Sequence, residues 1–109
     1  MKETRLPVVE VRTEEETEHG WRYHVFVELP GAAAPIEHIV LLSWVDHEHW
    51  SGGRFPPSRV VQRLVELILE RENGTAGGGA EGRGLPPSFD AATARRWFPG
   101  LDKAMAASL

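Results

Sequence analysis

The chain has 109 residues, of which 41% are hydrophobic and 26% charged, with a formal net charge of −4 and no cysteine. This length suits one domain with one modest core, so residues 1–109 are expected to form a single domain. The absence of cysteine excludes disulfides, thiolate metal sites and cysteine nucleophiles.

Charge is divided unevenly along the chain. Residues 1–53 hold four basic and ten acidic side chains, whereas residues 54–109 hold eight basic and six acidic ones. The acidic balance argues against nucleic acid or an anionic membrane as a partner. The first residues lack an apolar stretch of signal-peptide length, and no apolar run is long enough to span a bilayer. We therefore expect a cytoplasmic location and no membrane partner.

Three segments are predicted to be strands. Leu6–Thr13 and Trp21–Leu29 are rich in β-branched and aromatic residues. The second alternates, with one face formed by Trp21, Tyr23, Val25, Val27 and Leu29 and the other by Arg22, His24, Phe26 and Glu28. Glu37–Val45 is apolar on both faces, which is typical of a strand covered on both sides. Between the first two strands, the acidic segment Glu14–Gly20 predicts a solvated hairpin loop.

The longest predicted helix begins near Pro56-Pro57 and ends at Asn73-Gly74. Its apolar stripe consists of Val60, Val61, Leu64, Val65, Leu67 and Ile68. Residues 74–84 are predicted to be a flexible glycine-rich linker, and residues 85–109 a C-terminal helical segment capped by Asp90 or Ser88. The predicted fold class is therefore α+β: a three-stranded antiparallel meander followed by two or three helices packed on one face.

A polar cluster, Asp46–Trp50, follows the third predicted strand. If that strand continued, His47 and His49 would share one face and could supply two metal ligands. A third ligand could come from His24, His38 or a carboxylate. Hydration of a strand-end loop explains the same polarity without a metal. The sequence predicts no cofactor, and a metal-binding protein or metal-dependent enzyme using the two histidines is the alternative hypothesis.

Two further features have a structural and a functional interpretation. Ser51–Arg54, with Arg59 nearby, resembles an anion site in outline, but Pro56 and Pro57 remove backbone donors, which favours a chain-reversing turn.

The second alternative hypothesis is a weak nucleic-acid binder, whose basic and aromatic surface would consist of Arg95, Arg96 and Trp97. The structural interpretation is that the aromatic side chains dock on the core while both arginines stay solvated. No serine has a G-x-S-x-G setting, so catalysis is neither assigned nor excluded.

The order of motifs resembles a group of short uncharacterised bacterial proteins over about residues 20 to 105. The motifs are the strand end Trp44–Trp50, the glycine turn Ser51–Gly53, the P-x-x-V-V helix start Pro57–Val61, the L-E-R-E run Leu69–Glu72 and the segment Phe89–Pro99. The glycine-rich insert Thr75–Gly84 departs from that layout. The resemblance implies a compact bacterial domain with a β-β-β-α-α layout, and it implies no activity or catalytic residue.

The leading functional hypothesis is a non-catalytic interaction module that self-associates as a homodimer; an unknown protein partner is also considered. Its motivation is the third strand, which is apolar on both faces in a chain with few elements to cover it. The candidate interaction residues are Trp44, Trp50, Arg54, Arg59, Arg95, Arg96 and Trp97.

Overall fold

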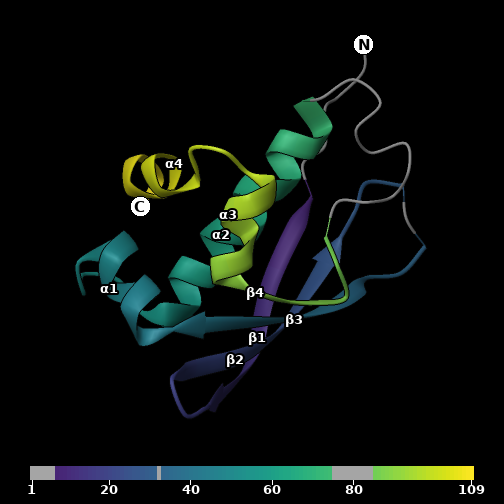
Figure 1. Ribbon diagram of the computed structural model, residues 1–109. Helices are drawn as coiled ribbons and strands as arrows, with labels where there is room; N and C mark the ends of the chain where they lie inside the picture. The colour runs from purple at the N-terminus through teal and green to yellow at the C-terminus, as the bar shows by residue number, and fades with distance from the viewer. Residues whose placement is uncertain (1–6, 32, 75–84) are drawn as a thin grey trace.

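A four-stranded sheet covered by helices forms the frame of the protein. The computed structural model describes residues 7–31, 33–74 and 85–109 (Figure 1). In chain order the elements are β1 (Val8–Glu16), β2 (Gly20–Glu28), β3 (Ile36–Ser43), α1 (Trp44–Ser51), α2 (Pro57–Gly74), β4 (Ser88–Asp90), the 3₁₀ helix η2 (Ala91–Thr93), α3 (Ala94–Trp97) and α4 (Leu101–Ser108). The predicted linker lies almost wholly outside the described residues.

The sheet has the strand order β1-β2-β3-β4, and its first three strands are antiparallel, as predicted. Tyr23 pairs with Val40 and Val25 with His38, which brings the buried residues of both strands to one side. The sequence did not predict β4, which runs parallel to β3 and pairs Phe89 with Val40. A bulge between Val11 and Thr13 shifts the β1 register.

The hairpin between β1 and β2 is tighter than predicted. Glu14–Glu16 continue β1 instead of forming a loop, and the turn closes with a hydrogen bond from Thr17 N to Gly20 O of 2.8 Å. Two contacts offset the repulsion between the glutamates. Arg22 Nε donates to Glu15 Oε1 at 2.8 Å, and the Tyr23 hydroxyl donates to Glu14 Oε1 at 2.6 Å.

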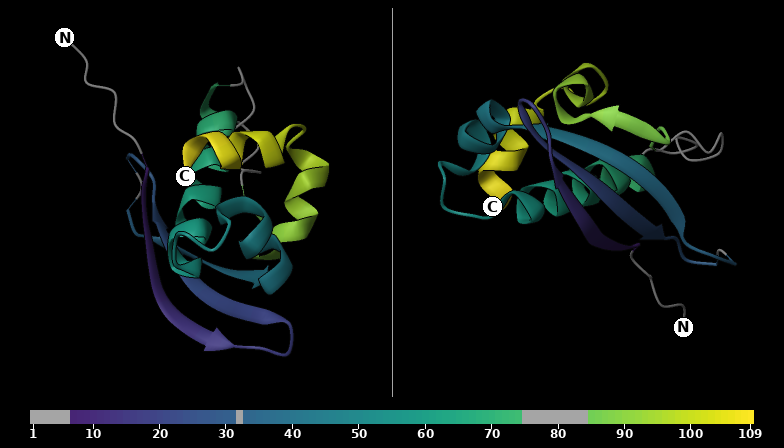
Figure 2. Two further views of the ribbon diagram at one scale, coloured as in Figure 1. Left: turned by 90° about the vertical axis from the view of Figure 1, so that its left-hand side faces the viewer. Right: turned by 90° about the horizontal axis from the view of Figure 1, so that it is seen from below.

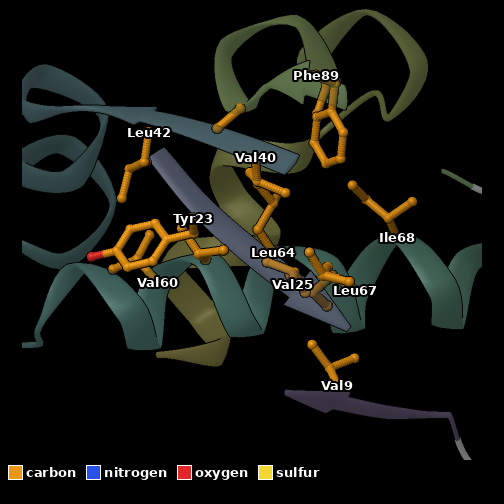
Figure 3. Packing of buried hydrophobic residues seen from close by; sticks show 14 of the residues in the cluster. Val9, Tyr23, Val25, Val40, Leu42, Val60, Leu64, Leu67, Ile68 and Phe89 are labelled. Atoms are coloured by element: carbon orange, nitrogen blue, oxygen red, sulfur yellow. The ribbon is translucent and has the colours of Figure 1, made fainter. Parts of the chain in front are cut away.

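Helix α2 supplies the helical side of the core (Figure 3). Its predicted stripe is buried, and Leu64 faces the sheet residues Val25 and Val40. The prediction that α2 begins at the proline pair is confirmed, with Pro57 as its first residue. This position needs no N–H donor, because the first N–H groups of a helix have no partner within it.

All the described helices lie on one side of the sheet (Figure 2), so the predicted α+β arrangement with helices on one face is confirmed. The opposite side of β1–β4, which we call the outer sheet face, is covered by no described element. Among the described residues, no helix combines the length and the apolar character needed to cross a membrane.

The polar cluster after β3 is a helix, which the sequence did not predict. Strand β3 ends at Ser43, two residues before the predicted end, and α1 begins at Trp44. Ser43 caps the helix, because its Oγ accepts a hydrogen bond from Asp46 N at 3.1 Å. Gly52 adopts φ of 63° and donates its N–H to Glu48 O at 2.7 Å, which ends the helix in the left-handed manner that glycine permits.

The C-terminal segment is helical after β4. Asp90 caps η2, since its Oδ1 accepts a hydrogen bond from Ala92 N at 2.9 Å. Asp90 was one of the two residues predicted to cap the C-terminal helical segment. The predicted break at Pro99-Gly100 separates α3 from α4, and Gly100 adopts φ of 82°. Leu101 and Met105 of α4 are buried in the core.

Candidate interaction site

The two histidines proposed as metal ligands do not share a face. In a helix, residues two apart point about 200° away from each other. His47 Nε2 lies 2.6 Å from Phe55 O, and its ring meets that of Trp21 edge-on at 5.3 Å. His49 is exposed, with Nε2 3.8 Å from Asp102 Oδ1. The strand continuation that would have aligned the two imidazoles is therefore wrong.

The other two histidines named as a third ligand lie elsewhere. His24 contacts Glu37 on the outer sheet face, whereas His38 is buried on the helix side with Nδ1 2.7 Å from Pro86 O. Within residues 7–31, 33–74 and 85–109, no group of three or more histidine or acidic side chains is placed to hold a metal ion.

Arg95 is the centre of a cluster that joins α1, α3 and α4. Its Nη2 donates to Asp46 Oδ1 at 2.8 Å and its Nε to Asp102 Oδ1 at 2.9 Å. The guanidinium carbon lies 4.9 Å from the ring centre of Trp50, whose Nε1 donates to the same Asp102 oxygen at 2.6 Å. We call Asp46, Trp50, Arg95 and Asp102 the Arg95 cluster.

Hydrogen bonds within the Arg95 cluster favour the charged forms of Asp102 and Arg95. Trp50, and then Arg95, lower the pKa of Asp102, because their N–H groups bond its carboxylate. Burial lowers the pKa of Arg95, but the hydrogen bonds to both aspartates outweigh this effect, so that pKa is raised. The expectation that Arg95 stays solvated is wrong. It is bound to its own chain.

Replacing Asp102 with asparagine tests the Arg95 cluster. The change removes the carboxylate charge, and we expect the free energy of unfolding to fall by about 1 kcal/mol at pH 7, since the site is half exposed. The folded pKa of Asp102 is lowered, so its contribution exists above the unfolded value of about 3.9 and is lost as the pH falls through the folded value.

Urea unfolding of both proteins between pH 2 and 7 measures this contribution. The difference between them should shrink toward the acidic end. Glu48→Gln, which neutralises an exposed carboxylate on α1, should change stability by less than about 0.5 kcal/mol. A deficit in Asp102→Asn that does not change with pH would contradict a charge-based role.

The remaining candidate interaction residues are scattered. Trp44 is 47% and Trp97 39% exposed, whereas Trp50 is buried and does not belong to a surface. Trp97 meets Phe89 edge-on at 5.3 Å instead of docking fully, and Arg96 beside it is exposed. Of the residues proposed for nucleic-acid binding, Arg95 is held by the two aspartates. Arg96 and Trp97 remain at the surface.

The proposed anion site is a turn. Ser51 Oγ donates to His47 O at 2.7 Å and accepts from Gly53 N at 3.0 Å. Arg54 N donates to Ser51 O at 3.1 Å, and the Arg59 guanidinium lies 5.6 Å from the Phe55 ring centre. The N–H groups of residues 53 and 54 thus donate to Ser51 and not to an anion, as expected for a chain-reversing turn.

The outer sheet face presents a patch of apolar side chains. Phe26 of β2 and Ile39 and Leu41 of β3 are half-buried there, although no described layer packs over them. The alternation in Trp21–Leu29 placed Phe26 on this face, but Phe26 was not among the predicted interaction residues. The signal was an aromatic residue on the otherwise polar side of an alternating strand.

Two arginines on the outer sheet face are paired with glutamates of β1. Arg12 Nη2 lies 3.0 Å from Glu10 Oε1, and its guanidinium covers Phe26 at 4.4 Å from the ring centre. Arg22 bonds Glu15 across the β1–β2 pair. A cavity of about 280 Å³ lies at the hairpin end, and its lining includes Arg22, Leu41 and Asp90.

No protein-family model, curated protein or solved structure matches the chain.

Proposed function

We propose that the protein is a non-catalytic interaction module that forms a homodimer through the outer sheet face. The observation that carries the proposal is the one-sided sheet, because all described helices lie on one side of it (Figure 2). The strand register places Phe26, Ile39 and Leu41 on the other side. A sheet with apolar residues on both faces is stabilised when a second layer covers the open one.

Charge pairing supports a second copy as the partner. Arg12 and Arg22 each bond a glutamate of the same chain, so the outer sheet face can be buried without leaving these arginines unpaired. A two-fold axis brings a patch against itself, and a patch that carries both charge signs can then oppose Arg to Glu. The apolar centre with a polar rim is the usual composition of such an interface.

Replacing Ile39 with glutamate tests the proposal. Sedimentation equilibrium of the wild-type protein should give twice the mass of one chain. The variant should dissociate with a Kd at least ~100-fold weaker, because a carboxylate is then buried at the centre of the interface. Leu41→Glu, on the same face, should act in the same way.

Val45→Glu is the matched control. Val45 is 76% exposed but lies on α1, away from the outer sheet face, so this variant should still dimerise. Circular dichroism should show that all three variants are folded. A wild-type protein that remains monomeric at about 100 µM would overturn the proposal, as would dimerisation that Ile39→Glu and Leu41→Glu leave unchanged.

We also propose a cytoplasmic location and a place among the short uncharacterised bacterial proteins that the motif order resembles. Support comes from three strands followed by the long helix α2, and from the absence of a membrane-spanning helix in the described part of the chain.

A further inference from the structure

A histidine lies in the middle of the outer sheet face. His24 is on β2, between Arg22 and Phe26 along the strand, and it pairs with Ile39 of β3. Its Nδ1 lies 2.6 Å from Glu37 Oε2, and the two side chains are 28% and 46% exposed. Glu37 pairs with Phe26, so the contact lies beside the apolar patch, on the surface that the proposed dimer buries.

The charges that surround His24 are mostly acidic. The charged side chains that face it on the outer sheet face are Glu10, Arg12 and Glu15 from β1, Arg22 and Glu28 from β2, Glu37 from β3 and Asp90 from β4. Both arginines are bonded to glutamates of β1. Glu37 instead contacts His24. Its negative charge is therefore neutralised by a neighbouring cation only when the imidazole is protonated.

We infer that protonation of His24 favours homodimerisation, so that the dimer is tighter in mild acid than at neutral pH. The inference rests on the proposed function. Burying the ionised Glu37 beside a neutral imidazole leaves one uncompensated negative charge in each copy, and the two charges lie in the same interface. A protonated His24 turns the contact into a short ion pair without a net charge.

Proton linkage gives the direction in which dimer affinity changes with pH. If the dimer binds more protons than two monomers, its stability is greatest below the titration range of histidine and decreases as the pH rises through that range. Histidine changes its charge between about pH 5 and 8, which places the expected transition there.

Sedimentation equilibrium at pH 5.5 and 7.5 measures the effect. The wild-type Kd should be at least about tenfold weaker at pH 7.5, since each linked proton contributes up to tenfold per pH unit. Glu37→Gln should remain tight at pH 7.5, because it removes the buried charge. His24→Gln should be weak at both pH values, because Glu37 then lacks a cation.

His19→Gln is the matched control, since His19 is exposed in the hairpin turn. This variant should keep the wild-type pH dependence. A wild-type dimer whose Kd is unchanged between the two pH values would overturn the inference alone, as would a pH dependence that persists in His24→Gln. A monomer at both pH values would instead overturn the proposed function.

Discussion

Replacing Leu64 with alanine is expected to lower the free energy of unfolding by about 4 kcal/mol. Leu64 is fully buried, and it lies between α2 and the sheet, where Val25 and Val40 meet the helix (Figure 3). Truncation removes three carbons and leaves a cavity that side chains from two layers must close. Small domains have only about 5–15 kcal/mol of stability, so the variant should be close to unfolding at 37 °C.

Urea unfolding followed by circular dichroism measures the loss. Leu64→Met keeps the side-chain volume, and it should cost less than about 1.5 kcal/mol. Equal losses in the two variants would show that the cavity is not the cause. A loss below about 1 kcal/mol in Leu64→Ala would contradict a tightly packed interface between α2 and the sheet.

Replacing Gly20 with alanine is expected to cost about 3 kcal/mol, although the change adds a single methyl group. A Cβ atom at residue 20 would lie 2.0 Å from Leu42 O and 2.7 Å from Ser43 Cα. Both contacts are with backbone, so a rotamer change cannot relieve them. The ends of β2 and β3 must separate, and this displaces Ser43, the cap of α1.

Gly31→Ala separates this clash from the general cost of replacing glycine. Gly31 has φ of 82°, and nothing lies within 4 Å of an added Cβ atom, so the change should cost about 1 kcal/mol. Thermal and urea unfolding of both variants supply the comparison. A Gly20→Ala protein as stable as Gly31→Ala would show that the β2–β3 end can shift freely.

Strand β2 and helix α2 could be predicted because each shows its periodicity within a few residues. Alternation in β2 identified Tyr23 and Val25 as core residues, and both are fully buried. The spacing of Val61, Leu64 and Ile68 identified the face of α2 that packs on the sheet. These patterns reflect burial on one side of a single element, so they can be recognised without knowing which distant residues pack against it.

Helix α1 was missed because its composition resembles a strand end. Trp44 and Val45 continue the apolar β3 pattern, and the following residues form no apolar stripe. The available signal was the pair of helix boundaries: Ser43 with Asp46 three residues later, and Gly52 after the last turn. Because α1 is a helix, His47 and His49 point in different directions, so they lack the shared strand face on which the alternative metal hypothesis depended.

Strand β4 and the Arg95 cluster depend on contacts that a single sequence does not reveal. β4 has only three residues, too few to show a period, and it is held by the distant strand β3. Arg95 and Asp46 are 49 positions apart, and their pairing requires α1 and α3 to be in place. Residue type alone therefore favoured a solvated arginine.

The bulge in β1 has a consequence for aggregation. β1 is an edge strand, and no described strand pairs with its edge away from β2. Exposed edges of this kind can recruit a strand from a second molecule. The irregular spacing at Val11–Thr13 and the glutamates at 14 to 16 oppose such recruitment, because two copies would align like charges along a broken ladder. Growth into fibrils by edge-to-edge extension is therefore disfavoured at this strand.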